Sequence, residues 1–215
     1  VALLALAYLE GREEDPQEFQ VLLLCAVFGA MTLAAADHFA TLVLGLEILS
    51  LPLYALVAYT QRTDRPVEAG LKYLVLSGVA STTLLLGIAF VYARTGSLGL
   101  EALGGAGIVA ADDPVLLAGA ALVLMAVAFK LSLVPFHMWT PDVYQGAPAP
   151  AAALLATIAK AGVVVVLLRL VLASETPAGG AVAGVLAVLA ALSMLAGNLL
   201  ALLQTSLKRL LADSS

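Results

Sequence analysis

Residues 113–139 read DPVLLAGAALVLMAVAFKLSLVPFHMW, an apolar stretch that contains one lysine, Lys130, and one internal proline, Pro135. A helix needs roughly 20 residues to cross a bilayer, so this stretch is long enough to do so. Proline inside a helix frees a backbone carbonyl and kinks or interrupts the helix. The sequence therefore predicts a membrane span that is discontinuous near an ionisable side chain.

The rest of the chain has the same apolar character. Of its 215 residues, 62% are hydrophobic and only 12% are charged, whereas soluble domains carry about 25% charged residues. This composition excludes an ordinary soluble enzyme and a disordered chain. The net charge of −5 without a basic run argues against a nucleic-acid partner. The single cysteine, Cys25, cannot build an iron–sulfur cluster, and we expect no cofactor in this chain.

Long runs without charge predict an all-α, polytopic transmembrane helix bundle that forms a single domain over residues 1–215. The expected helices are 1–9 (the end of one), 18–37, 39–60, 67–93, 113–139, 147–172 and 176–207, with 95–112 as a loop. The last run has no charge over 32 residues, which exceeds one ordinary span, and a further helix is expected beyond Lys208. Because the chain begins inside an apolar stretch without Met and stops at residues 213–215 without a clear terminating signal, we expect an internal fragment of a longer protein.

Basic residues in the loops predict which end of the bundle faces the cytoplasm. The loops on one side hold five basic residues, and the other side holds two. The positive-inside rule places the first side in the cytoplasm. The five are Arg12, Arg62, Arg65, Lys208 and Arg209; the two are Arg94 and Arg169, of which Arg169 is expected to be an interfacial anchor.

Four ionisable residues lie within the expected spans: Glu47, Lys72, Lys130 and Lys160. A charge at the bilayer centre costs at least about 2.5–3.5 kcal/mol, so such residues mark ion pathways or charge pairs. At ~1.5 Å of rise per residue, Glu47, Lys130 and Lys160 lie ~12–18 Å from the nearest expected helix end, near the midplane. Lys72 lies only ~9 Å in, and a lysine stem can reach water from there.

One acid and several lysines at this depth suit proton transfer. Burial weakens the hold of a lysine on its proton, and a nearby carboxylate strengthens it, so a moving partner makes a switch. Glu47 and Lys130 have the composition of such a pair, although a purely structural ion pair is the alternative. His137 is an auxiliary candidate because imidazole exchanges protons near neutral pH. Discontinuous helices line ion sites in transporters, which supports this interpretation of Lys130 and Pro135.

The stretch 130–148, KLSLVPFHMWTPDVYQGAP, resembles the signature of the proton-conducting membrane transporter family. This family comprises the antiporter-like subunits of respiratory complex I, with relatives in Mrp-type cation/proton antiporters and membrane-bound hydrogenases. Residues 150–162 and 197–212 continue the resemblance, and residues 46–56 look most like complex I members. One departure is Asp213, which stands where the family usually has tyrosine.

The resemblance implies the first inverted repeat of an antiporter-like fold, with a discontinuous helix. It also implies that the key glutamate of the family falls on Glu47. The lysine of the discontinuous helix then falls on Lys130, the central lysine on Lys160 and a further lysine on Lys72. Under this interpretation all four residues transfer protons, and no residue of this chain binds a metal or a cofactor.

The function that follows is a non-redox membrane subunit of complex I, in which quinone reduction elsewhere drives proton translocation. Flavin, iron–sulfur clusters and quinone are then expected in partner subunits. The expected partners are other membrane subunits, lipid, water and protons, and the expected location is the bacterial inner membrane, crossed several times. The alternatives are a subunit of an Mrp-type antiporter or membrane-bound hydrogenase, and a purely structural membrane subunit.

Overall fold

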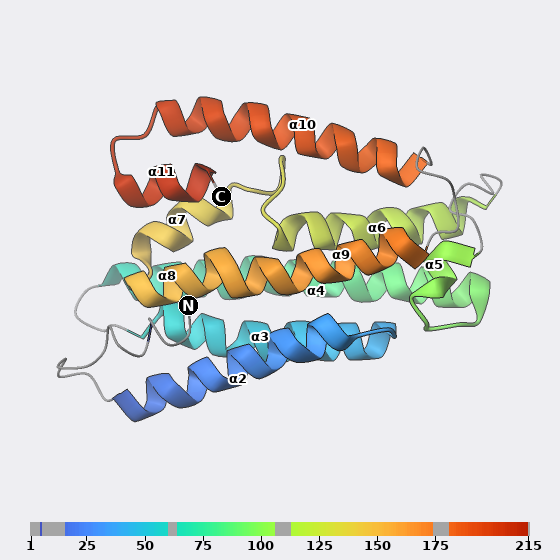
Figure 1. Ribbon diagram of the computed structural model, residues 1–215, viewed down its shortest axis with the longest axis horizontal. Coiled ribbons are helices and arrows are strands. Elements are labelled where there is room, and N and C mark those ends of the chain that lie inside the picture. Colours follow the sequence, from blue (N-terminus) through green and yellow to red (C-terminus); the bar gives the residue numbers. More distant parts are fainter. Residues whose placement is uncertain (1–4, 6–15, 60–63, 106–112, 174–180, 215) are drawn as a thin grey trace.

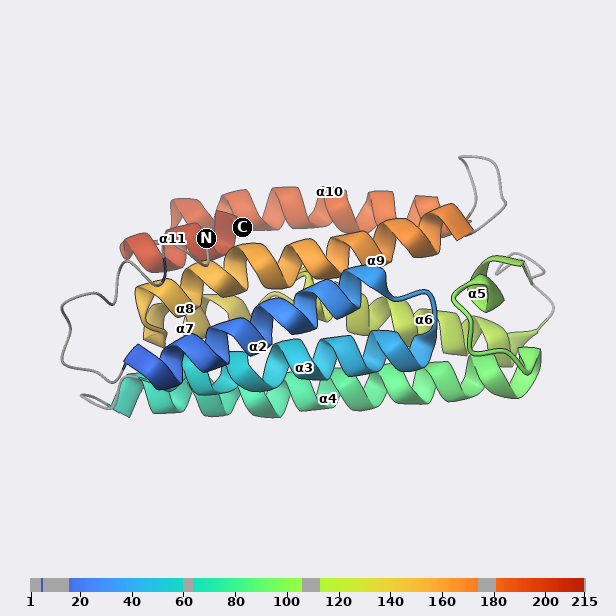
Figure 2. The same ribbon diagram turned by 60° about the horizontal axis from the view of Figure 1, so that its bottom comes forward.

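The structure is a computed structural model that describes residues 5, 16–59, 64–105, 113–173 and 181–214. The long helices lie side by side along the longest axis of the molecule (Figures 1 and 2). In chain order the elements are α2 Pro16–Ala35, α3 Phe39–Val57, α4 Asp64–Thr95, α5 Glu101–Gly105, α6 Pro114–Lys130, α7 Trp139–Gly146, α8 Ala149–Leu154, a π-helical turn Leu155–Ala159, α9 Lys160–Ala173, α10 Ala181–Leu202 and α11 Leu207–Ser214.

Five of the described helices are long and apolar enough to cross a membrane. They occupy 17–35, 39–57, 65–95, 149–172 and 184–202, and α6 is a shorter apolar helix. Many of the large side chains on α4 and α10 are apolar and exposed, for example Leu71, Val79 and Leu199. Such outward-facing apolar surface is what a lipid-exposed helix presents. The all-α transmembrane fold expected from the sequence is therefore confirmed.

Several helix bounds differ from those expected. The expected span 113–139 is two helices, because α6 ends at Lys130 and α7 begins at Trp139. The expected span 176–207 ends at Leu202, and α11 begins at Leu207 rather than beyond Lys208. The short helix α5 lies within the expected loop 95–112. The expected helix 1–9 lies outside the described residues, apart from Ala5.

The regular helix α6 ends at Lys130, five residues before Pro135. Ser132 has a φ of 59°, a left-handed conformation that α-helices do not contain. Its neighbours leave the regular pattern too, since Leu133 N donates to Ala128 O at 2.9 Å. Val134 N donates instead to the Ser193 hydroxyl of α10 at 2.9 Å. We call residues 131–138 the irregular segment; it contains Pro135, which has no N–H to donate.

Close helix contacts depend on glycine at two crossings. Gly29 of α2 faces the backbone of α3, where an added Cβ would lie 2.3 Å from Leu49 N. Gly87 of α4 and Gly119 of α6 face each other, and a Cβ on Gly87 would lie 2.9 Å from Gly119 O. Small residues at such crossings let membrane helices approach closely. These contacts hold α2 against α3, and α4 against α6.

Polar caps stabilise the end of the bundle opposite to α7 and α11. Asp113 accepts hydrogen bonds from Val115 N and Leu116 N, which makes it the N-cap of α6. Arg94, at the end of α4, forms an ion pair with Asp113. Arg169 Nη1 donates to Ala36 O at 3.1 Å, just beyond the end of α2, and so satisfies a carbonyl that the helix leaves unpaired.

Candidate functional site

Lys130 lies at the C-terminal end of α6 and is held by two serine hydroxyls. Its Nζ donates to Ser50 Oγ of α3 at 2.9 Å and to Ser77 Oγ of α4 at 2.6 Å. Ser50 and Ser77 are buried, with 2% and 0% of their surface exposed. The ammonium group therefore sits between three helices and is bound by neutral oxygen atoms. We call Lys130, Ser50 and Ser77 the lysine cradle.

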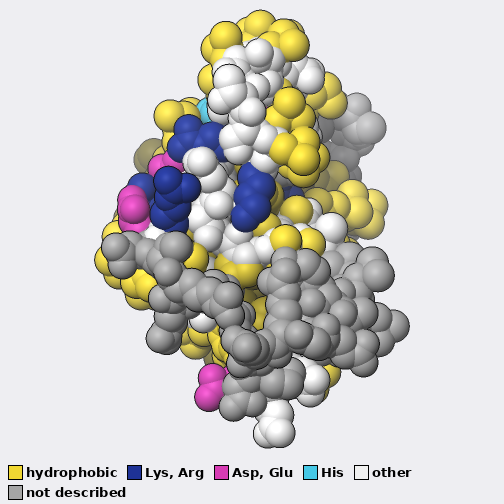
Figure 3. All heavy atoms as spheres, turned by 90° about the vertical axis from the view of Figure 1, so that its left-hand side faces the viewer, with side chains coloured by type: hydrophobic (Ala, Val, Ile, Leu, Met, Phe, Trp, Pro, Cys, Tyr) yellow, Lys and Arg dark blue, Asp and Glu magenta, His cyan; other side chains and the backbone are white. Residues whose placement is uncertain are grey.

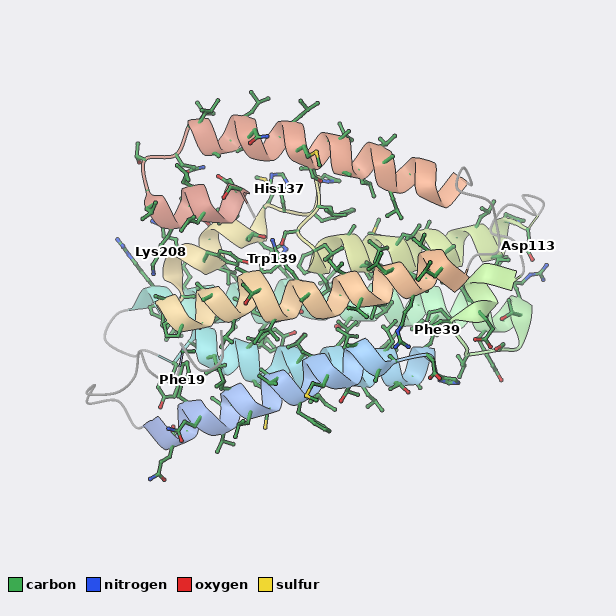
Figure 4. The ribbon with its side chains drawn as sticks, viewed as in Figure 1. Phe19, Phe39, Asp113, His137, Trp139 and Lys208 are labelled. Atoms are coloured by element: carbon green, nitrogen blue, oxygen red, sulfur yellow. The ribbon has the colours of Figure 1, made fainter. Side chains whose placement is uncertain are left out.

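Aromatic side chains hold the lysine cradle on the side of α7. Tyr54 donates to Ser77 Oγ at 2.7 Å. The Trp139 ring, labelled in Figure 4, is stacked on Tyr73 and on Phe129 at centroid distances of 5.1 Å and 5.4 Å. Its indole N–H donates to Phe129 O at 3.3 Å. The first residue of α7 is thereby fixed against α4 and α6.

Glu47 of α3 is held by Ser81 of α4, one helical turn beyond Ser77. Its Oε1 accepts a hydrogen bond from Ser81 at 2.6 Å. A cavity of about 10 Å³ is lined by Ser81, the partner of Glu47, and by Lys130 together with apolar side chains. A space of about 10–15 Å³ by this measure accommodates one water molecule. Within the described ranges no salt bridge joins Glu47 to Lys130, so in this structure hydroxyl groups are the partners of both.

Lys160 is half-buried at the start of α9, directly after the π-helical turn. A π-helical turn inserts an extra residue into a helix and is often found at functional sites. Two residues further on, Gly162 packs on Leu33 of α2, where an added Cβ would lie 3.1 Å from Leu33 Cδ2. The structure thus places Lys160 on a different helix pair from Lys130, next to α2 rather than between α3 and α4.

Lys72 lies at the charged end of the bundle, not with Glu47 and Lys130. Its side chain is 44% exposed, and its Nζ lies 2.8 Å from Glu68 and 3.3 Å from Asp142. Figure 3 shows lysine, arginine and acidic side chains gathered on this end of the molecule. A polar pocket of about 250 Å³ opens here, which we call the charged pocket. Its polar lining residues are Arg65, Glu68, Lys72, Asp142, Gln145 and Arg209.

Asp142 of α7 is shared between two cations from different helices. Besides Lys72 of α4, it accepts a hydrogen bond from Arg209 Nη2 of α11 at 2.8 Å. Arg209 Nε also donates to Gln145 Oε1 at 2.6 Å. Lys208, labelled in Figure 4, donates to Ala147 O at 2.8 Å. The short helix α7 therefore joins α4 to α11 through one carboxylate.

His137 lies in the irregular segment and borders a cavity that α10 also lines (Figure 4). The nearby Ser132 accepts a hydrogen bond from Thr140 at 2.8 Å. Of the six residues singled out from the sequence, Lys130 lines the small cavity, Glu47 is bonded to Ser81 of the same lining, and Pro135 lies in the helix break. Lys72, Lys160 and His137 occupy three separate surroundings.

The hydroxyl partners of the site were not predicted from the sequence. Ser50, Ser77, Ser81 and Tyr54 carry no charge, and single hydroxyl groups are common in apolar helices. The one available signal is spacing, because Ser77 and Ser81 are four residues apart and so share a helix face. That face of α4 carries both the Lys130 partner and the Glu47 partner.

Comparisons with known proteins agree on one family. The family described as NADH:quinone oxidoreductase/Mrp antiporter, TM, matches residues 36–215. The subunit N of NADH-quinone oxidoreductase from Methylococcus capsulatus is 53% identical over 215 residues, which is 100% of this chain and 44% of the relative. The same subunit of Acinetobacter baumannii is 48% identical over 213 residues, 97% of this chain and 42% of the relative. The chain thus spans less than half the length of these relatives.

Solved structures share the fold. A chain of respiratory complex I from Thermus thermophilus, solved with bound aureothin, has a TM-score of 0.81 and 41% identity over 99% of this chain and 46% of its own length. A chain of an archaeal membrane-bound sulfane sulfur reductase has a TM-score of 0.81 and 29% sequence identity. The match covers 99% of this chain and 44% of the length of that chain. A chain of the Mrp complex from Dietzia sp. DQ12-45-1b has a TM-score of 0.81 and 24% sequence identity, over 99% of this chain and 39% of the length of that chain. At this level of identity the likeness shows the fold alone.

These findings agree with the resemblance carried by residues 130–148. Together with the five apolar helices, they identify a multi-pass protein of the bacterial inner membrane. Its fold matches that of a chain of complex I over 99% of its own length. The chain belongs to the NADH:quinone oxidoreductase/Mrp antiporter transmembrane family.

Proposed function

We propose that this chain is part of a non-redox, proton-translocating membrane subunit of NADH-quinone oxidoreductase, with quinone reduction in other subunits as the driving reaction. The names of the two subunit N relatives support this proposal. The observation that carries it is Lys130, an ammonium group enclosed by Ser50 and Ser77. Its partners are then the other membrane subunits, lipid and protons. Flavin, iron–sulfur clusters and quinone are then bound by other subunits of the complex.

Lys130 is the centre of the proposed proton transfer. Its ammonium group has two alternative stabilising partners: the hydroxyls of the lysine cradle and the carboxylate of Glu47, which Ser81 orients. A water molecule between the two groups can accept a proton from the ammonium group while it gives one to the carboxylate. The small cavity lined by Lys130 and by Ser81, the partner of Glu47, supports this step. A shift of Lys130 between these partners would change its hold on the proton.

The charged pocket is the proposed entry from the cytoplasm. Lys72 and Asp142 line a polar space of about 250 Å³, which is large enough for many water molecules. On α4, Lys72 lies five residues before Ser77, which is about 8 Å along the helix axis. We place Lys72 at the pocket end of the proposed pathway, the lysine cradle beyond it, and Lys160 as the acceptor further across the bundle, on α9.

Two substitutions in the complete complex test this function. Lys130→Ala and Lys160→Ala remove the two deeper ammonium groups, and both should lower NADH-driven proton pumping into vesicles while the complex still assembles. The matched controls are Lys130→Arg and Lys160→Arg, which keep the positive charge and separate loss of charge from loss of packing. Unchanged pumping in both alanine variants would favour a purely structural subunit.

A cation/proton antiporter subunit is the second candidate, because the family includes Mrp members and the Mrp chain from Dietzia has the same fold. The two functions differ in their need for sodium. Replacement of sodium by choline should leave pumping by the reconstituted complex unchanged if only protons move. A requirement for sodium would overturn the proton-only proposal and favour the antiporter.

A further inference from the structure

A second polar cavity lies on the other face of the irregular segment from the lysine cradle. It has a volume of about 180 Å³ and is enclosed by the irregular segment, α10 and α11. Its polar side chains are Ser132 and His137 from the irregular segment, Ser193 from α10, and Asp213 and Ser214 from α11. Figure 4 shows His137 between α10 and the irregular segment. We call this space the His137 cavity.

Two ionisable side chains in this cavity have buried polar atoms that lack partners. Both ring nitrogens of His137 and the Oδ2 atom of Asp213 are inaccessible and make no hydrogen bond within the described part of the chain. Buried polar atoms in proteins are nearly always paired with protein groups or with ordered water. An imidazole and a carboxylate that border the same cavity therefore point to water molecules between them.

The cavity is suited to water in both size and lining. One water molecule needs about 10–15 Å³ by this measure, so 180 Å³ accommodates several. Each buried water also needs two to four polar partners, about three on average. Besides the imidazole and the carboxylate, the hydroxyls of Ser132 and Ser193 border the space. Ser193 is fixed there because it accepts from Val134 N and donates to Leu189 O.

The nearby charged groups are engaged elsewhere. Lys130 donates to Ser50 and Ser77 on the opposite face of the irregular segment. On α11, Lys208 binds the carbonyl of Ala147 and Arg209 binds Asp142. The sequence of α10 contains no ionisable residue. Among the residues that line the His137 cavity, His137 and Asp213 are therefore the two ionisable ones.

We propose that His137 and Asp213 form a proton-holding pair across this water-filled cavity, with the proton on the imidazole and the negative charge on the carboxylate. When the pair takes part in transfer, the imidazolium gives its proton to a cavity water and that water gives one to the carboxylate. The pair then has neutral imidazole and neutral carboxylic acid, and the reverse step restores the charges. The ligand of the site is a hydrated proton.

The charge of the His137 imidazole tests the proposal without any measurement of pumping. The complete protein is labelled with ¹⁵N-histidine, placed in lipid vesicles at neutral pH and examined by solid-state NMR, with His137→Gln to assign the signal. In the wild-type protein His137 should give the signal of a doubly protonated ring. In Asp213→Asn it should give the signal of a neutral ring, and Asp213→Glu should restore the charged form.

Two controls separate this effect from a general disturbance. Ser214→Ala changes a residue of the same cavity but keeps the carboxylate, so the His137 signal should stay that of a charged ring. His38 lies at the start of α3, where its Nδ1 accepts from Ala40 N, and its signal should be the same in every variant. A His137 signal that is identical in wild type and Asp213→Asn would overturn the proposal, whatever the outcome of the pumping experiments.

Discussion

At the scale of single residues, Ser77 is the most informative side chain of the site. Its oxygen accepts from both Lys130 and Tyr54, and it is completely buried. A hydrogen bond to a charged group contributes about 1.5–3 kcal/mol. Ser77→Ala should therefore change the hold of Lys130 on its proton and slow proton pumping, on the order of tenfold for a 1.4 kcal/mol effect.

The control for Ser77→Ala is Thr82→Ala on the same helix. Within the described ranges, the Thr82 hydroxyl is bonded to backbone carbonyls of its own helix, those of Gly78 and Val79. Its loss removes a hydroxyl of similar kind without any contact to Lys130. The measurement is the initial rate of NADH-driven acidification in vesicles, and equal rates in the two variants would count against a role for the cradle.

Asp142 carries a second residue-scale prediction. It pairs with Lys72 and Arg209, and all three side chains are about 40% exposed, so each pair contributes only about 0–1 kcal/mol to stability. Asp142→Asn should thus change the thermal midpoint little but slow proton entry, because Lys72 loses its link to α7 and α11. Glu68→Gln is the matched control. Glu68 also pairs with Lys72 but, unlike Asp142, it forms no ion pair with Arg209 of α11 among the described residues. A large loss of stability with normal pumping would make Asp142 a structural residue.

The sequence revealed the charged members of the site but not their partners. Glu47, Lys130 and Lys160 are conspicuous because an ionisable residue inside an apolar span has a high free-energy cost. Ser50 and Ser77 have no such cost, so nothing marks them before the helices are packed. The sequence predicts that Lys72 lies only ~9 Å inside its span, and its partners Glu68 and Asp142 hold it at the charged end of the bundle.

At the scale of elements, the start of α6 offers a prediction about pH. Arg94 beside Asp113, together with the N–H groups of Leu116 and Val115, lowers the pKa of this carboxyl below its ordinary value of 3.8. A carboxyl whose pKa is lower in the folded state contributes stability above its unfolded pKa and loses it as the pH falls through the folded pKa. Acidification below about pH 4 should therefore weaken the attachment of α6 to α4.

Asp113→Asn tests this prediction, because asparagine can still cap the helix but has no charge for Arg94. At neutral pH the variant should unfold at a slightly lower temperature than the wild type. The difference between them should disappear as the pH falls below the folded pKa of Asp113. Thermal unfolding in detergent at a series of pH values measures it, and a difference that persists in acid would contradict the assigned cause.

The helix break shows what the sequence could not resolve at this scale. Pro135 predicts an interruption, but α6 already ends at Lys130 because Ser132 adopts a left-handed conformation and Val134 bonds to Ser193 of α10. That bond joins residues 59 positions apart, so no local pattern could indicate it. The π-helical turn before Lys160 is similarly a result of packing, since its sequence, LATIA, is ordinary for a helix.

At the scale of the whole molecule, the basic residues are sorted by end. Arg65 and Arg209 line the charged pocket, and Lys208 lies at the same end of the bundle (Figure 4). Arg94 pairs with Asp113, which Figure 4 labels at the opposite end, and Arg169 binds Ala36 O just beyond the end of α2. Arg12 and Arg62 lie outside the described residues. The positive-inside rule then places the charged pocket in the cytoplasm, as proton entry through Lys72 and Asp142 requires.

Labelling of single cysteines tests this orientation directly. Cys25 is the only cysteine in the printed sequence, so Cys25→Ala gives a cysteine-free background over these residues. Glu68→Cys then marks the charged end and Glu101→Cys the opposite end, and both positions are exposed. A membrane-impermeant maleimide should label Glu101→Cys, but not Glu68→Cys, on the outer face of intact spheroplasts. Inverted vesicles should give the reverse pattern. Labelling of Glu68→Cys from outside would place the charged pocket in the periplasm, and proton uptake would then have to begin from the end capped by Arg94 and Asp113.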